Sequence, residues 1–472
     1  MYVLQLVFGQ IWIARHCSLR RFVALLLALL LLRRTPIALR GLLIVEIGNK
    51  GLAHARGPVR KPLLTAEMLF QFAAMALIAF QSGTVNRQAL ILAVALPAVT
   101  ALTAGIMGRI WPVDRAILIM VLFLCSLGIV TLSDIARADV TPRTQAIYAL
   151  AGIFAMYVGA AFIRRFTGWQ KYYRALMVLC VMALLSPYLP VVGIVKNGAR
   201  NWVGFKSLSV QPSEFMKPVM ILCLAAGFAN RPRFAQCIPT LAFAAVCCAI
   251  LLVQRDLGAV LLYFLTTVLM YYAATSNAFI TLSGLGMGAG AAVVAYRLIP
   301  LVQTRVALWK NPWSDPTDKG LQLVQALIAI GSGGLFGMGL GLGRPRSIPL
   351  YYSDFIFAAI TEEFGLIFAI GVLTVYVLII MRGLIVAFNA RTSFHSLSSL
   401  GLVVILGLQT MLIVGGNTKL IPLTGVTLPL VCYGGSSLVS TFFSMGVLLG
   451  ISSMNAEDEA RDIERIEIRE EI

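Results

Sequence analysis

The stretch YYSDFIFAAITEEFGLIFAIGVLTVYVLIIM, residues 351–381, decides the structural class of this protein. It is apolar over more than the roughly 20 residues that a transmembrane helix needs. It nevertheless carries Asp354 near its start, with Glu362 and Glu363 inside it. A carboxylate at bilayer depth costs about 2.5–3.5 kcal/mol on insertion scales, so such a group usually faces a protein interior or a water-filled cavity. The stretch therefore predicts a membrane helix whose carboxylates have a structural or a functional purpose.

The whole chain has the composition of a polytopic membrane protein. Of its 472 residues, 59% are hydrophobic and 12% are charged, whereas about 25% of the residues of a soluble domain are charged. The net charge of +18 comes from short basic clusters between apolar runs, which is typical of loops that obey the positive-inside rule. Because these clusters form no basic patch with interleaved aromatic residues, we expect the lipid bilayer and no nucleic acid as a partner.

Cysteines, histidines and glycines give no sign of a nucleotide or zinc site. The eight cysteines lie mostly inside apolar runs without a CxxC pair, and the three histidines are far from them. We interpret the cysteines as small buried hydrophobic residues. No Walker motif occurs, so we expect no bound nucleotide. The predicted outer face has no histidine, which excludes a Ser–His–Asp triad.

Twelve apolar stretches are candidates for spans, each of about the length that a bilayer requires. They are 62–82, 87–109, 114–134, 143–163, 173–195, 212–230, 236–253, 256–276, 278–299, 353–381, 396–415 and 429–451. Basic pairs such as Arg164/Arg165 and Arg382/Arg391 fall in alternate loops, which we assign to the cytoplasm. The pattern predicts an all-α polytopic membrane protein with one consistent orientation.

The two ends of the chain have opposite charge. Residues 1–61 are predicted to be a cytoplasmic or interfacial segment, in which Phe22–Leu32 is apolar and lies between arginine pairs. This stretch is short for a span, so we favour an interfacial helix over a thirteenth span. A cleaved signal peptide is not expected, since RRTP is no cleavage site. Residues 452–472 are acidic, and we favour a solvated cytoplasmic tail over a docking tail.

The longest predicted loop, residues 300–352, lies on the outer side. It contains RVALWKNPWSDPTDKG and then the glycine-rich run GSGGLFGMGLGLG. The glycines follow no strand of a βαβ unit, so we expect close helix packing or a bent re-entrant segment. Loops of this length in compact proteins are usually functional.

Three other outer-face pieces can meet this loop. They are 197–217, 254–258 and 417–437, all rich in Gly, Pro, Asn and Ser beside apolar spans. We expect broken or capped helix ends there. In the first piece Ser213 could cap a helix that carries Lys217, and Pro218 would disturb that helix.

Lys217 needs an anionic partner inside the membrane. Glu214, three residues earlier on the same helix, is the structural candidate. Asp354 is the functional candidate, and such a pair would keep its carboxylate ionised at neutral pH, as a base or a cation-holding group requires. The pattern leaves both partners open.

Glu362 and Glu363 are not placed to act as a close carboxylate pair with Asp354. On a regular helix Glu362 lies about 12 Å deeper and about 80° around the axis, and Glu363 faces the opposite side. We therefore favour hydrogen bonds that tie helices together over catalysis for both residues.

Four ordered blocks resemble the SEDS family, the FtsW/RodA/SpoVE group. The blocks are NGARNW…QPSEFMK, NPWSDP…GLQLVQALIAIGSGGLFGMGLG, SDFIFAAITEEFG and PLTGVTLPLVCYGGSS. The similarity covers about 114–451 and implies a core of ten spans, with the large loop between core spans 7 and 8. The spans within 62–109 would then be an N-terminal extension.

The resemblance implies a peptidoglycan glycosyltransferase that polymerises lipid II at the outer face of the cytoplasmic membrane, with a class B penicillin-binding protein as partner. The 4-hydroxyl of one lipid II would attack the anomeric carbon of another, with inversion, and release undecaprenyl diphosphate. A role in elongation, division or sporulation stays open. The alternatives are a lipid II flippase or other secondary transporter, and a non-catalytic scaffold. A transporter predicts inverted repeats, and we find no convincing repeat.

The resemblance also assigns roles to residues. Asp354 matches the family's essential aspartate and Lys217 the lysine that pairs with it, so both are candidate catalytic residues. Asp354 would be the base, and a candidate ligand for a divalent cation such as Mg²⁺ or Mn²⁺. The candidate substrate-binding residues are Arg200, Trp202, Gln211, Arg305, Lys310, Asn417 and Ser436. Glu214, Glu362 and Glu363 are candidates for structural polar residues.

Five residues depart from the family pattern. Asn201 stands in place of a basic residue, Arg255 in place of a proline, and Cys432 in place of a serine. Tyr352–Ser353 replaces the His–Thr pair before the aspartate. The departures leave Asp354 and Lys217 unchanged.

Overall fold

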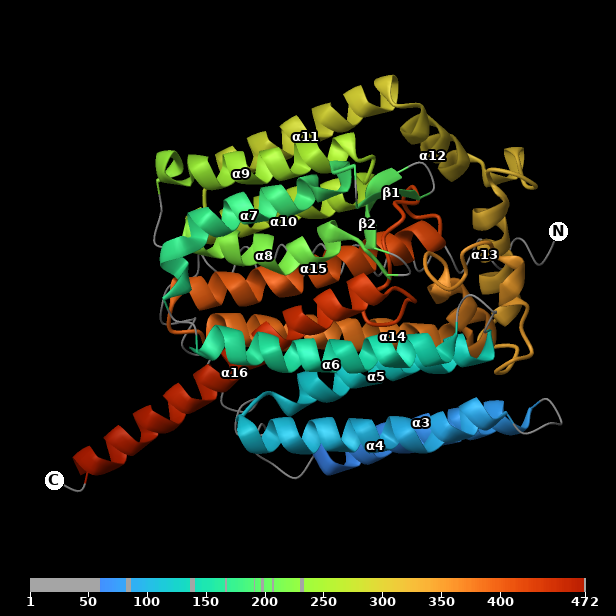
Figure 1. The fold of residues 1–472 in the computed structure, drawn as a ribbon, viewed down its shortest axis with the longest axis horizontal. Helices are drawn as coiled ribbons and strands as arrows, with labels where there is room; N and C mark the ends of the chain where they lie inside the picture. The colour runs from blue at the N-terminus through green and yellow to red at the C-terminus, as the bar shows by residue number, and fades with distance from the viewer. Residues whose placement is uncertain are drawn as a thin grey trace. The chain divides into compact units, whose positions relative to one another are not determined.

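The computed structural model describes residues 60–81, 86–135, 141–165, 168–190, 192–196, 199–205, 208–229 and 233–470. These residues are mostly helical, with one small sheet (Figure 1). The chain forms two compact units, Met1–Pro62 and Leu63–Ile472, and nearly all described residues belong to the second. The interfacial helix predicted at Phe22–Leu32 lies outside the described residues.

The helices follow one another along the chain with short connections. They are α3 (Arg60–Phe80), α4 (Arg87–Ile110), α5 (Arg115–Asp134), α6 (Pro142–Arg165), α7 (Tyr173–Leu185), α8 (Pro212–Phe228), α9 (Phe234–Val253), α10 (Leu257–Thr275), α11 (Ala278–Leu298), α12 (Pro300–Lys310), α13 (Leu321–Gly333), α14 (Ile356–Phe388), α15 (Ser393–Asn417) and α16 (Gly435–Glu470). Short 3-10 turns also occur, namely η3 (Trp169–Tyr172), η4 (Ser186–Tyr188), η5 (Pro312–Ser314) and η6 (Pro345–Ser347).

The predicted polytopic all-α class is confirmed. In the described part of the chain, 10 helices are long and apolar enough to cross a membrane, and α3 and α4 are among them. The predicted stretches 173–195 and 212–230 correspond to shorter helices, α7 of 13 residues and α8 of 17 residues. The prediction for 173–195 was too long because Pro187 and Pro190 follow α7, and proline cannot continue a helix.

The helices α5, α15 and α16 lie at the centre of the bundle, since most of their side chains are buried, whereas α11 is almost wholly exposed. Small residues let the backbones approach closely, as is usual between membrane helices. A Cβ at Gly446 of α16 would lie 2.1 Å from the carbonyl oxygen of Met156 in α6. A Cβ at Gly159 of α6 would lie 2.5 Å from the carbonyl oxygen of Phe443.

The two ends of the bundle differ. One end carries the small sheet, α12 and α13, and we call it the loop end (Figure 1). At the other end, which we call the tail end, α16 continues as a long helix to Glu470. Arg164 of α6 ties this extension to the bundle through Glu457, at 2.8 Å, and Arg391 pairs with Asp458 at 3.3 Å. The predicted acidic tail is thus helical, with its first turns anchored.

The small sheet was not predicted. Strands β1 (Gly193–Lys196), β2 (Ala199–Phe205) and β3 (Leu208–Val210) pair antiparallel in the order β1-β2-β3. The prediction of helix ends was therefore wrong for this part of 197–217. The sequence did hold a signal, because an Asn-Gly dipeptide between two β-prone runs is typical of a hairpin.

Helix α8 begins at a different residue from the predicted one, and it contains a proline beyond its first turn. Its N-cap is Gln211, with Pro212 in the first turn, where proline is favoured, so Ser213 is not the cap. Pro218 lies inside the helix and cannot donate to the carbonyl of Glu214. The Ser440 hydroxyl donates to that carbonyl instead, at 2.6 Å. The tertiary structure thus supplies the hydrogen bond that proline removes.

Helix α14 is broken at Gly365, whose φ of 84° and ψ of 170° are not helical. A break leaves backbone groups on both sides without helical partners. The N–H groups of Met338 and Gly339 donate to the carbonyls of Glu362 and Glu363, at 2.8 and 3.0 Å. These two donors belong to residues 334–343, which we call the glycine-rich segment.

The pairing also runs in the opposite direction. The N–H groups of Leu366 and Ile367 donate to the carbonyls of Gly334 and Leu335, at 3.0 and 3.2 Å. In a regular helix these N–H groups would bond to residues four positions earlier, so the segment replaces the lost helical bonds. Because an unsatisfied backbone group at membrane depth costs several kcal/mol, the broken helix and the segment depend on each other. The predicted bent, closely packed segment is present.

We expect Gly337→Ala to destabilise this pairing. A Cβ at Gly337 would lie 2.2 Å from the carbonyl oxygen of Glu363, and φ there is +86°, where a side chain costs on the order of 1–3 kcal/mol. The melting temperature of the protein in detergent should therefore fall by several degrees. Gly331→Ala is the matched control, since a Cβ there meets nothing within 4 Å and alanine favours a helix. Equal losses in the two variants would contradict the pairing.

Candidate functional site

Asp354 lies in the turn before α14, at the loop end, and other segments hold its backbone. The Nδ2 group of Asn417, the last residue of α15, donates to the carbonyl of Asp354 at 2.8 Å and to that of Ile413 at 3.0 Å. The N–H of Tyr433 donates to the carbonyl of Tyr352 at 2.9 Å. The position of Asp354 is therefore fixed through its backbone by α15 and by the residues before α16.

Cys432 adds a further contact to this turn. Its Sγ donates to the carbonyl of Ser353 at 2.7 Å and accepts from the N–H of Leu428 at 2.9 Å. A thiol, like the hydroxyl of serine, is both a donor and an acceptor. The cysteine that departs from the family pattern thus keeps both roles at this position.

The Asp354 carboxyl group is half-buried and lies near Arg305 of α12. Burial raises the pKa of Asp354 to about 6, and the positive charge of Arg305 opposes this rise. Burial lowers the pKa of Arg305, and the negative charges of Asp354 and Asp256 oppose that change. The site therefore combines an acid that titrates near neutral pH with a cation.

Arg305 is held in place by the residues that follow α15. Its guanidinium donates to the carbonyl of Thr424 at 3.1 Å, and Trp309 of the same helix donates from Nε1 to the carbonyl of Lys419 at 3.2 Å. A guanidinium has five N–H donors, so the bond to Thr424 leaves others for an anionic ligand. Helix α12 thereby brings a residue of the long loop to Asp354.

Lys217 pairs with Glu214 and not with Asp354. Its Nζ lies 2.8 Å from Oε1 and 2.8 Å from Oε2 of Glu214, and it donates to Oε1 of Gln409 at 3.1 Å. No ion pair joins Lys217 to Asp354 among the described residues. The predicted Asp354–Lys217 pair is thus corrected, because three residues along one helix turn bring Glu214 to the lysine.

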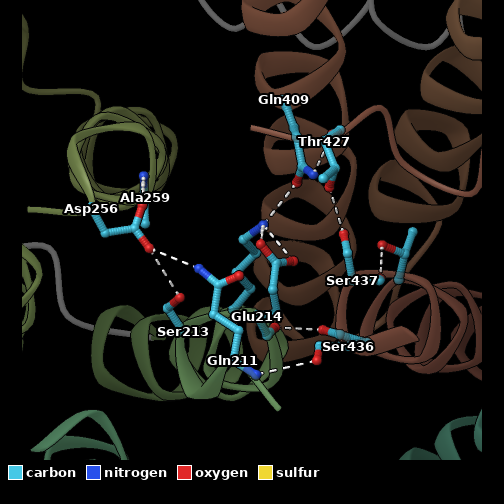
Figure 2. Close-up of polar contacts among 12 residues, drawn as sticks. Gln211, Ser213, Glu214, Asp256, Ala259, Gln409, Thr427, Ser436 and Ser437 are labelled. Carbon is cyan, nitrogen blue, oxygen red and sulfur yellow. Dashed lines mark hydrogen bonds and ion pairs between the residues drawn. The ribbon is translucent and has the colours of Figure 1, made fainter. Parts of the chain in front are cut away.

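Asp256, in the residues before α10, joins three polar side chains. Its Oδ2 accepts from Asn201 at 3.1 Å, from Gln211 at 2.9 Å and from Ser213 at 3.3 Å. Its Oδ1 caps α10 by accepting from the N–H of Ala259 at 3.1 Å. Figure 2 shows Gln211 and Ser213 turned toward this carboxylate. Asp256 therefore ties the sheet, α8 and α10 together.

Sequence reasoning did not single out Asp256, although it lies in the outer-face piece 254–258. The available signal was an aspartate directly before an apolar run, which is typical of a helix N-cap. Asn201, which departs from the family's basic residue, is explained by the same cluster, since its amide donates to Asp256.

A second set of contacts joins α8 to α15 and α16. The N–H of Gln211 donates to the hydroxyl of Ser436 at 3.2 Å. Gln409 of α15 donates to the carbonyl of Thr427 at 2.8 Å, and the hydroxyls of Thr427 and Ser437 lie 2.9 Å apart. Figure 2 shows these contacts around Glu214. Gln211 and Ser436 thus belong to the frame of the site.

The remaining predicted substrate-binding residues lie elsewhere. Arg200 donates from Nε to the carbonyl of Pro187 at 3.1 Å, and its guanidinium lies 5.4 Å from the ring centre of Tyr188. Lys310 is exposed at the end of α12, and Trp202 lies in β2. The structure thus uses Arg200 to fix the sheet against η4.

Glu362 and Glu363 lie on the first part of α14, before the break. Oε1 of Glu362 accepts from the N–H of Arg344 at 3.0 Å, which ties α14 to the residues after the glycine-rich segment. Glu363 is 1% exposed and lies near Asp134 at the end of α5. The contact of Glu362 is of the architectural kind that the sequence predicts.

The residues around Asp354 offer few ligands for a metal ion. Among the described residues, no group of three or more His, Cys, Asp or Glu side chains could hold a metal ion. Asp354 offers one carboxylate, with a guanidinium beside it. Mg²⁺ is commonly held by one or two carboxylates together with substrate phosphates. The residues therefore fit a cation that binds together with a diphosphate, and do not fit a cation held by protein groups alone.

This arrangement suits one class of chemistry. A carboxylate with a pKa near the operating pH can take a proton from a hydroxyl. An arginine near that carboxylate can stabilise negative charge on a leaving group. The loop end therefore has the parts for transfer of a group from an anionic leaving group to a hydroxyl.

Comparison with known proteins gives consistent matches. The family model of FtsW/RodA/SpoVE cell cycle proteins matches residues 109–457. The stage V sporulation protein E of Bacillus subtilis is 35% identical over 324 residues, 66% of this chain and 86% of that protein. The peptidoglycan glycosyltransferase RodA of Mycobacterium tuberculosis is 32% identical over 364 residues, 72% of this chain and 78% of that protein.

A solved structure also matches. It comes from work on the structural coordination of polymerization and crosslinking by a peptidoglycan synthase complex. One chain of it superposes with a TM-score of 0.62 at 26% identity, over 73% of this chain and 98% of that chain. Helix α3 and nearly all of α4 precede the range that the family model matches.

The Lys217–Glu214 pair predicts a specific pattern of stability. Lys217→Met should lower the free energy of unfolding by about 3–5 kcal/mol, because it leaves a buried carboxylate without its cation; the two side chains are 7% and 12% exposed. Lys217→Met/Glu214→Gln should recover most of this loss, and Lys217→Met/Asp354→Asn should recover none. Thermal unfolding in detergent measures all three. If only the Asp354 double variant recovers stability, Lys217 pairs with Asp354 and not with Glu214.

Proposed function

Because the chain belongs to the FtsW/RodA/SpoVE (SEDS) family of cell cycle proteins, we propose that it is a peptidoglycan glycosyltransferase. Its substrate is lipid II, which it polymerises into glycan strands. The observation that carries this proposal is the half-buried carboxyl group of Asp354, whose pKa is about 6 and which lies near the positive charge of Arg305. The names of the relatives support the reaction class, and the geometry supports the residues.

The proposed orientation places the loop end outside the cytoplasmic membrane. Basic residues lie in the short connections of the tail end and in the helix turns beside them, as the positive-inside rule requires of a cytoplasmic face. They include Arg164, Arg165, Lys171, Arg174, Arg233, Arg382 and Arg391. Asp354 and Arg305 then face the side on which the cell wall is built.

In the proposed mechanism Asp354 is the general base. Its ionised carboxylate accepts the proton of the 4-hydroxyl of one lipid II while that oxygen attacks the anomeric carbon of a second lipid II. The bond between the anomeric carbon and the diphosphate oxygen breaks, and undecaprenyl diphosphate leaves. Asn417 orients the base, because it holds the Asp354 backbone at 2.8 Å.

Arg305 stabilises the departing diphosphate. Charge-assisted hydrogen bonds from a guanidinium to phosphate are short, strong and often bidentate. Asp354 would be the residue that holds a divalent cation, Mg²⁺ or Mn²⁺, and such an ion would supply further positive charge to the site. Lys217 supports the site from beneath as the partner of Glu214 and Gln409, which makes it a positioning residue.

A class B penicillin-binding protein is the proposed partner. Polymerised strands need crosslinks, and the structurally similar chain comes from work on a complex that coordinates the two reactions. The partner of this chain would therefore supply the transpeptidase.

The proposed role of Asp354 as the base predicts a large loss of activity when its carboxylate is removed. Purified protein with its partner should convert lipid II into glycan polymer, and Asp354→Asn should lower the rate by at least about 100-fold, since general-base catalysis contributes roughly 10²–10⁴-fold. Gel separation of the glycans measures the product. Asp318→Asn, a change at an exposed aspartate of the same loop, should leave the rate unchanged. Movement of lipid II across vesicle bilayers without polymer from the wild type would favour the transporter instead.

The pKa of Asp354 also predicts how the polymerisation rate depends on pH. Since Asp354 must be ionised, the polymerisation rate should rise with pH through about 6, the pKa to which burial raises this carboxyl group. Arg305 lowers that pKa, so Arg305→Gln should move the rise to higher pH and reduce activity more at pH 6 than at pH 8. Lys319→Gln, at an exposed lysine, is the control. An unshifted profile in Arg305→Gln would contradict the pair.

A further inference from the structure

Helices α3 and α4, which we call the accessory pair, lie outside the matched family range except for the end of α4. The proposed reaction assigns no role to them. Their packing shows what they cover. One apolar cluster joins the accessory pair to α5, with members Ala74, Met75, Ile78, Ala79, Ala89, Ala93 and Val130. Leu340 and Phe364 pack against this cluster.

These two contacts fall on the two partners of the backbone pairing. Leu340 belongs to the glycine-rich segment, and Phe364 directly precedes Gly365, where α14 is broken. Irregular backbone at membrane depth is tolerated only where protein or a water-filled cavity surrounds it. The accessory pair therefore shields the place where the segment enters the break.

A polar contact adds a specific connection. Gln81, directly after α3, donates from Nε2 to the carbonyl of Leu340 at 2.9 Å. The next residue, Gly341, has a φ of +76°, and a Cβ there would lie 1.9 Å from Nε2 of Gln81. The glycine thus makes room for the glutamine, and the two fit each other as a contact pair.

The glycine-rich segment leads directly to the reacting group. Its C-terminal neighbour Arg344 is held by Glu362 at 3.0 Å, and the carbonyls of Glu362 and Glu363 accept from the segment. Asp354 lies between these two anchors in sequence, before the first turns of α14. A shift of the segment would therefore move α14 and the turn that carries Asp354.

We propose that the accessory pair is a positioning element for the reaction, and that Gln81 is its positioning residue. By clamping the glycine-rich segment in the break of α14, the pair fixes the turn that carries Asp354. This inference rests on the proposed function for its catalytic part, whereas the clamp itself can be measured without any reaction.

The first test measures the clamp by amide hydrogen exchange of the full-length protein in lipid nanodiscs. Gln81→Ala should speed exchange of the Gly337, Met338 and Gly339 amides about three- to tenfold, as expected for loss of one hydrogen bond. Gln81→Lys, which keeps a donor, should restore slow exchange. Gln88→Ala, an exposed glutamine at the start of α4, is the control. Unchanged exchange in Gln81→Ala would overturn the proposal.

The second test separates positioning from folding by lipid II polymerisation with the same four proteins. We expect kcat of Gln81→Ala to fall about three- to tenfold with KM unchanged, because misplacement of a reacting group lowers the rate of the chemical step. Gln81→Lys should recover kcat. Faster exchange with unchanged kcat would overturn the positioning role. An inactive wild type would instead mark failure of the proposed function, which removes the catalytic part of the proposal and leaves the exchange result to decide the clamp.

Discussion

The structure depends on one constraint, which is that backbone N–H and C=O groups at membrane depth need partners. The break at Gly365 in α14 satisfies it with four hydrogen bonds to the glycine-rich segment. The carbonyl freed by Pro218 in α8 satisfies it with Ser440. Each irregular point is thus bound by hydrogen bonds to another part of the chain.

Most polar side chains near the site already have hydrogen-bond or ion-pair partners, so few of them are left to act on a substrate. Asp256 is occupied by Asn201, Gln211 and Ser213, and Lys217 is occupied by Glu214 and Gln409. Asp354 differs, since its backbone is held by Asn417 while its carboxyl group lies near the positive charge of Arg305. The polar groups below the site thus act as a frame, and the pair above them can meet a substrate.

Local patterns predicted most of the long membrane-spanning helices and singled out Asp354 as a candidate, whereas α12 and α13 lie in a stretch that was predicted to be a loop. Long apolar runs can only be buried or face lipid, and the motif around residues 353–365 is distinctive. The neighbours of Asp354 were harder to predict, because they depend on where α12 packs. Arg305 reaches Asp354 only through contacts of α12 with Thr424 and Lys419, which no spacing in the sequence reveals. The partner of Lys217 is Glu214 for the opposite reason, because this acid lies one turn away on the same helix.

The accessory pair meets a further requirement of the site, because the irregular backbone of a broken helix must be shielded from lipid. A structure of the Asp354→Asn protein with lipid II, determined in a lipid nanodisc, tests the central claim most directly. We expect an acceptor 4-hydroxyl within hydrogen-bond distance of residue 354 and a donor diphosphate against Arg305. Lipid II bound at mid-membrane depth between helices, away from both residues, would contradict it.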